Sequence, residues 1–195
     1  MTIIPKAEED PDLLVWVDVE TTGLKTDSCQ LLEVACLITD TDLNLLDETG
    51  DHAVVRYDGD IDFLRANTDA FVEQMHERTG LWDRIASGTP REQVEGELLA
   101  YIRQFAPARR QGRLAGNSVR LDLNFLDAHL PAVTEHLHYR SIDVSSVAAL
   151  AYWWFGSDTW TSKKAAHTAM ADIRESLDQL RRLRDRIFTP AGQVA

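Results

Sequence analysis

The sequence predicts a single α/β domain, with a sheet built early in the chain and helices packed around it. Three observations predict this class. Apolar runs of strand length come first, segments with a helical period of apolar residues follow, and short apolar runs then alternate with helices. The chain has 195 residues, of which 44% are hydrophobic and 27% are charged. This is enough for one domain with a substantial core.

The expected sheet begins with three consecutive strands. The first is the apolar run at residues 13–19, the second covers residues 31–40, and the third covers residues 43–57 and can break near Gly50. The connections between these runs are short, which favours antiparallel pairing of neighbours along the chain.

Helical periodicity begins near Asp60, and short helices are expected around Gly80. Thr89 followed by Pro90 is typical of an N-cap and a first helical residue, and the amphipathic helix after them ends near Pro107. The remaining elements are expected as a strand at 113–117, a helix at 118–130, a strand at 141–144, a helix through 147–155 and a helix at about 167–188. Residues 13–188 therefore form the expected domain, with tails at 1–12 and 189–195.

Composition restricts the class of function. The formal net charge is −12, whereas proteins that hold long nucleic acids need a basic surface, so any nucleic-acid substrate should be short or held locally. Two cysteines, Cys29 and Cys36, make no disulfide framework. The acidic first residues do not resemble a signal peptide, and no run reaches the ~20 apolar residues of a membrane span. A cytoplasmic protein without a membrane partner is expected.

The first strand ends in two acids, Asp18 and Glu20. Alternate residues of a strand point to the same side, so the two carboxylates should project together. Crowded like charges at the end of a buried strand repel each other unless a cation lies between them. The pair therefore predicts a divalent-metal site, although a D-x-E pattern alone is common on surfaces.

Three more candidates lie far along the chain. Asp122 follows a Gly-Asn-Ser turn and falls in the first turn of its helix, which separates it from the equally acidic Asp127. Asp172 lies near the start of the last helix, where the helix dipole favours a carboxylate. His167, five residues earlier, can point into a cleft. Taken singly, a solvated acid and an exposed histidine explain Asp122 and His167 as well, and five other histidines have the same side chain: His52, His76, His129, His136 and His138.

Together these residues resemble the DEDD exonuclease superfamily, in the subgroup with a histidine five residues before the last aspartate. The resemblance is strongest to members that act on very short RNA, and it covers most of residues 13–188. The blocks that carry it are WVDVETTGL (16–24), LLEVACLITDTDLNLL (31–46), MHERTGL (75–81), GNSVRLDLNFL (116–126), HYRSIDVSS (138–146) and AHTAMADIRESLDQL (166–180). The resemblance implies a ribonuclease-H-like mixed sheet flanked by helices, which agrees with the order of elements above.

The resemblance also implies a mechanism. Phosphodiester hydrolysis by two divalent ions needs hard oxygen ligands, which suit Mg²⁺ or Mn²⁺. Asp18, Glu20, Asp122 and Asp172 would hold the two ions. His167 would act as the general base, since imidazole accepts a proton near neutral pH.

The substrate contacts follow from the same resemblance. Leu24 matches an aliphatic residue that wedges against the bases, and His76 a histidine near the 3′ end. Phe71 stands where many members have a base-stacking tryptophan, although a core phenylalanine explains it equally well. The residues expected to cap a 5′ phosphate are Ser118, Arg140, Ser145 and Ser146, with Tyr139 from the second copy of a homodimer. Such a cap restricts the substrate to short oligoribonucleotides, 5′-phosphorylated dinucleotides above all.

Two alternatives of other kinds remain at this point. A broader 3′→5′ exonuclease of the proofreading or DNA-trimming type would share the metal site, but the expected phosphate cap argues against it. A non-catalytic nucleotide-binding domain would not need the complete set of four acids and one histidine.

Overall fold

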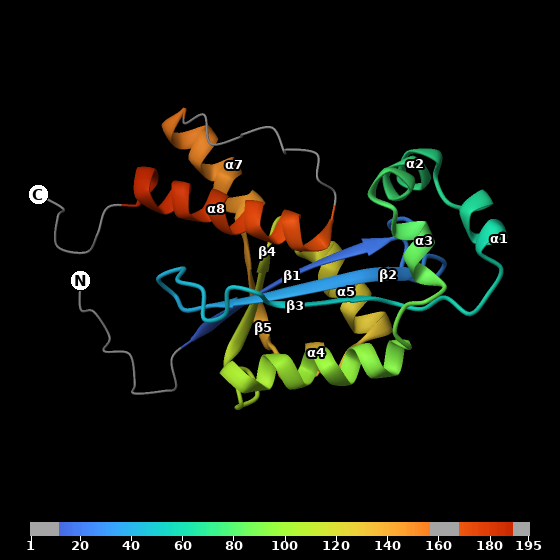
Figure 1. Ribbon diagram of the computed structural model, residues 1–195. Coiled ribbons are helices and arrows are strands. Elements are labelled where there is room, and N and C mark those ends of the chain that lie inside the picture. The colour runs from blue at the N-terminus through green and yellow to red at the C-terminus, as the bar shows by residue number, and fades with distance from the viewer. Residues whose placement is uncertain (1–11, 157–167, 189–195) are drawn as a thin grey trace, which may run out of the picture.

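The protein is described here by a computed structural model, which covers residues 12–156 and 168–188. Within them lies one mixed sheet of five strands in the order β3-β2-β1-β4-β5, with helices on both faces (Figure 1). The strands are β1 (Leu13–Thr21), β2 (Leu31–Thr39), β3 (Asp51–Val54), β4 (Gly112–Gly116) and β5 (His138–Asp143). The helices are α1 (Ile61–Ala66), α2 (Ala70–Thr79), α3 (Leu81–Ile85), α4 (Arg91–Phe105), α5 (Arg120–His129), α6 (Pro131–His136), α7 (Val144–Phe155) and α8 (Ala169–Ile187).

Strand β1 is the centre of the sheet and forms two kinds of ladder. It pairs antiparallel with β2 as far as Thr21, whereas its parallel pairing with β4 stops at Trp16. β3 joins β2 antiparallel, and β5 joins β4 in parallel. The carboxyl half of β1 therefore has a strand neighbour on one side only.

The two faces of β1 pack against different helices. Val15, Val17 and Val19 belong to a core shared with α4, α5 and α6, while Leu14 and Trp16 belong to a core shared with α7 and α8. Figure 1 shows the same layers, with α7 and α8 on one face of the sheet and α4 and α5 on the other. Alternation along β1 thus decides which helix each of its side chains meets.

Helices α1, α2 and α3 gather beyond the carboxyl end of β1 (Figure 1). Gly80 ends α2 and begins α3 with φ of 67°, a left-handed conformation that favours glycine. Trp82 on α3 is buried and donates its indole N–H to the Glu73 carbonyl on α2 at 3.0 Å. None of the helices in the described residues is both long and apolar enough to cross a membrane.

The expected order of elements is confirmed, except that some boundaries differ, as at β5, which begins at His138, and that one helix is added. Residues 43–57 do not form one strand, because β3 covers only Asp51–Val54. The chain before β3 forms a turn that the Asp47 side chain stabilises. Asp47 accepts the N–H groups of Thr49 and Gly50, and Gly50 has φ of 75°. Helix α6, which begins with a proline at its first turn, was not expected from the sequence.

The predicted cap of α4 is wrong by one residue. Pro90, not Thr89, is the N-cap, and no side chain caps the helix. Thr89 is held in a parallel bridge with Val55: its N–H donates to the Val54 carbonyl at 2.8 Å, and its carbonyl accepts the Arg56 N–H at 2.8 Å. Backbone pairing with the end of β3 therefore overrides the local capping preference.

Candidate active site

The two acids of β1 lie on the α8 face of the sheet. They continue the alternation of Leu14 and Trp16, so Asp18 and Glu20 follow two buried apolar residues along the same side of the strand. Glu20 is 7% exposed, and Asp18 is half-buried. Across the strand pair Asp18 faces Ala35. Ala35 is fully buried in the core that the sheet shares with α8.

Helix α8 brings a third carboxylate to this place. Asp172 lies in its first turn and is buried, and its backbone N–H donates to the Thr168 carbonyl at 3.0 Å. One oxygen each of Asp18, Glu20 and Asp172 lie within 4.8 Å of one another. Three carboxylates this close favour a cation between them, and an all-oxygen donor set suits a hard divalent ion.

Asp122 approaches β1 from α5, which packs on the opposite face of the sheet from α8. It lies in the first turn of α5, is 5% exposed, and accepts the Val19 N–H through Oδ1 at 3.1 Å. Val19 stands between Asp18 and Glu20 in the strand. Asp122 is not one of the three residues whose oxygens meet within 4.8 Å, but it is bonded to the backbone that carries two of them.

The predicted general base, His167, lies outside the described residues. The next residue, Thr168, is the N-cap of α8, four residues before Asp172.

His76 lies beside the acids but is fully buried. Its Nε2 donates to the Thr21 carbonyl at 2.8 Å, and its Nδ1 lies 3.9 Å from Glu20 Oε2. Burial lowers the pKa of His76, against the raising effects of the Thr21 hydrogen bond and the Glu33 charge. A neutral imidazole that supports the end of β1 is the role that this geometry favours. The expected contact with the 3′ end of a substrate stays a prediction.

Two apolar side chains predicted to contact bases are exposed. Leu24, in the turn after β1, is 76% exposed, and Phe71, in the first turn of α2, is 70% exposed. The alternative in which Phe71 is a core residue is therefore wrong. An exposed ring and an exposed aliphatic side chain near the carboxyl end of the central strand are available to a ligand.

The three predicted phosphate-cap serines meet around a residue that sequence reasoning missed. Asp143, the N-cap of α7, accepts the backbone N–H groups of Ser145, Ser118 and Ser146 through Oδ1 at 2.9, 3.1 and 3.4 Å. The Ser118 and Ser145 hydroxyl oxygens lie 3.4 Å apart. The signal for Asp143 was available, because an aspartate directly before a helix start is a typical N-cap.

Tyr139 and Arg140 lie on β5, one of the two edge strands of the sheet, and both are exposed. The Arg140 guanidinium carbon lies 5.3 Å from the centre of the Tyr139 ring. The ring of His138 stacks on the Tyr139 ring, with 4.4 Å between the two ring centres. Neighbouring side chains thus restrain Tyr139, although the ring itself is 72% exposed.

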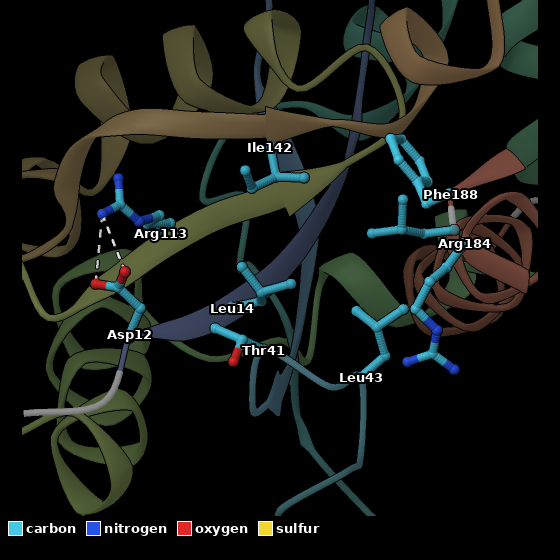
Figure 2. Close-up of a pocket in the computed structure, with 9 residues that line it drawn as sticks. Asp12, Leu14, Thr41, Leu43, Arg113, Ile142, Arg184 and Phe188 are labelled. Atoms are coloured by element: carbon cyan, nitrogen blue, oxygen red, sulfur yellow. Dashed lines mark hydrogen bonds and ion pairs between the residues drawn. The ribbon is translucent and has the colours of Figure 1, made fainter. Parts of the chain in front are cut away.

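A mainly apolar cavity of about 340 Å³ lies at the opposite end of β1 from the acids. Figure 2 shows its lining, with the Asp12–Arg113 ion pair at 3.2 Å on one side and Arg184 on the other. The lining residues are Asp12, Leu14, Thr41, Leu43, Arg113, Ile142, Leu180, Arg184 and Phe188. None of the clustered carboxylates borders this cavity, so it is separate from the candidate active site.

Comparison with known proteins gives matches along nearly the whole chain. Residues 15–180 match the family described as Exonuclease (RNase_T). An oligoribonuclease from Streptomyces avermitilis is 40% identical over 92% of this chain and 88% of its own. The mitochondrial oligoribonuclease of Mus musculus is 42% identical over 90% of this chain and 73% of its own.

A solved structure of similar fold is the zinc-bound complex of E. coli exonuclease I with single-stranded DNA. It has a TM-score of 0.69 at 14% identity. The match covers 90% of this chain but only 41% of exonuclease I. At this identity the likeness extends to the fold alone.

Proposed function

The chain belongs to the exonuclease family, and on that basis we propose that it is a 3′→5′ exoribonuclease that hydrolyses very short oligoribonucleotides to 5′-mononucleotides. The observation that carries the proposal is the cluster of Asp18, Glu20 and Asp172, at one end of the central strand, in a chain that matches oligoribonucleases over most of its length.

The chemistry requires an attacking water and relief of charge on the phosphate. Asp18, Glu20, Asp122 and Asp172 are proposed to hold two Mg²⁺ or Mn²⁺ ions, which when bound lower the pKa of water and polarise the phosphoryl oxygens. The carboxylate donor set fits these ions, since hard divalent cations prefer oxygen ligands. His167 is proposed to take the proton from the attacking water.

The substrate side of the proposal rests on exposed residues. Phe71 is proposed to stack on a base, which is worth ~1–3 kcal/mol, and Leu24 to wedge against the bases. Arg140 and the serine hydroxyls around Asp143 are proposed to close the 5′ side on a terminal phosphate, with Tyr139 of a second copy completing the cap. A closed 5′ side makes dinucleotides the preferred substrates, and it fits the net charge of −12.

The test is a length series of 5′-phosphorylated oligoribonucleotides from two to seven units, with Mg²⁺, with Mn²⁺ and with a chelator. We expect metal-dependent release of mononucleotides, fastest from the dinucleotide, and none from the Asp18→Ala variant. Equal rates on a dinucleotide and a long single strand would instead indicate a broader exonuclease. Absence of release with either metal would indicate a non-catalytic domain.

A further inference from the structure

A second carboxylate lies directly beside one of the proposed metal ligands. Glu33 of β2 pairs with Glu20 of β1 in the antiparallel ladder. Directly opposed residues point to the same face, with Cβ atoms about 4.5–5.5 Å apart, and like charges at such positions destabilise the pair. Without compensation, Glu33 would add a further negative charge to the acids on this face.

The compensation is built into the fold. The Glu33 side chain is 2% exposed, and each oxygen has its own partner: Oε1 lies 2.7 Å from His52 Nε2, and Oε2 accepts from Arg84 Nη2 at 3.2 Å. Burial alone would raise the pKa of Glu33, but the hydrogen bonds and charges of His52 and Arg84 hold it below its ordinary value. Glu33 is therefore a buried carboxylate that keeps its charge, next to a paired guanidinium.

The group made of Glu33, His52 and Arg84 lies next to the proposed metal site. The charge of Glu33 acts on His76, whose Nδ1 lies 3.9 Å from Glu20. A cavity of about 570 Å³ is lined by all three members of the group and also by Thr168 and Met170, at the start of the helix that supplies Asp172. A change of charge at Glu33, His52 or Arg84 should therefore alter the electrostatic potential at the proposed metal site.

We propose that Glu33 is a positioning residue for the metal site: it keeps the Arg84 guanidinium occupied, so that this cation does not neutralise Glu20. The inference rests on the proposed function, because it concerns how the same acids stay available to a metal. Arginine pairs readily with carboxylates through its fork of N–H groups, and Glu20 is the adjoining carboxylate across the strand pair. Glu33 and Arg84 together add no net charge beside Glu20.

The proposal predicts opposite effects for the two partners. Glu33→Gln leaves an uncompensated positive charge near the site, whereas Arg84→Met leaves an uncompensated negative charge. Even at the dielectric constant of water, about 80, a unit charge about 8 Å from a divalent ion shifts metal affinity by about sixfold, and the shift is larger at the lower effective dielectric constant near a protein surface. Glu33→Gln should weaken metal binding, Arg84→Met should strengthen it, and the double variant should return close to the starting value.

The experiment is titration of the metal-free protein with Mn²⁺ alone, followed by the electron paramagnetic resonance signal of free Mn²⁺. A matched control is Arg84→Lys, which keeps the charge and should bind Mn²⁺ like the unchanged protein. In turnover assays, Glu33→Gln should need more metal for half-maximal rate and recover most of its kcat at saturating metal. A purely structural role predicts that both single variants bind less well and that the double variant is no better than either, a result that would overturn the proposal.

If Glu33→Gln does not fold, the comparison of Arg84→Met with Arg84→Lys still decides. Tighter Mn²⁺ binding by Arg84→Met alone supports the proposal, and equal binding by the two variants refutes it. The Asp18→Ala variant separates this inference from the proposed function. Undiminished Mn²⁺ binding by Asp18→Ala would refute the metal site itself, whereas loss of the opposite effects at Glu33 and Arg84 would refute only the positioning role.

Discussion

Replacement of Asp122 tests whether one side chain supports both the fold and the chemistry. Strand β1 continues beyond its pairing with β4, which stops at Trp16. In the part that β4 does not pair, Asp122, which is 5% exposed, accepts the Val19 N–H through Oδ1 at 3.1 Å. Asp122→Ala removes that acceptor and leaves the Val19 N–H buried without it, at a cost of about 1–3 kcal/mol. Asp122→Asn keeps an oxygen in the same place and removes only the charge.

The comparison of the two variants isolates the hydrogen bond. Loss of a negative charge near Asp18 and Glu20 relieves repulsion in both variants, so this effect largely cancels between them. We expect Asp122→Asn to unfold in urea with a free energy about 1–3 kcal/mol greater than that of Asp122→Ala, measured with a chelator present. Both should lose turnover, because both lack the charged ligand. Equal stability of the two variants would refute the structural half of this reasoning.

Three further predictions concern other residues. His167→Ala should lower kcat by about 10²–10⁴-fold while Mn²⁺ binding stays unchanged, and a loss of metal affinity would instead make His167 a ligand. Arg140→Ala should slow hydrolysis of a 5′-phosphorylated dinucleotide by about tenfold to a hundredfold, with a smaller loss on a heptamer; equal losses would contradict the phosphate cap. The pKa of Glu33 is held below its ordinary 4.5 in the folded state, so its stabilising contribution should be complete above pH 4.5 and lost as the pH falls through the folded-state value. Acid should therefore lower the free energy of unfolding of the unchanged protein more than that of Glu33→Gln, as measured by urea unfolding at a series of pH values.

The strand that carries the site could be predicted because its pattern is local. Alternation in residues 13–21 places Asp18 and Glu20 on one face whatever the rest of the chain does. The preference for Asp122 over Asp127 also had a local basis, the first turn of a helix, and the structure buries Asp122 and leaves Asp127 exposed. Periodicity and turn residues were enough for these assignments.

Glu33 could not be interpreted in the same way. Within the apolar run of β2 it looks like an exception to the pattern, and its partners His52 and Arg84 lie 19 and 51 residues further along the chain. Similarly, Thr89 looks like a helix cap until the strand that it pairs with is known. Both cases depend on contacts between distant segments, which no local pattern encodes.

The occupied amides around Asp143 have a consequence for how the proposed cap responds to salt. Because Asp143 already accepts the backbone N–H groups of three serines, a 5′ phosphate at this place would meet hydroxyls and the Arg140 guanidinium rather than open amides. A single arginine neutralises about one phosphate, which for single strands gives a slope of roughly −0.7 in log affinity against log salt concentration. Binding of short RNA would then weaken only slightly between dilute and concentrated buffers, whereas proteins that hold long strands lose affinity by orders of magnitude over the same range.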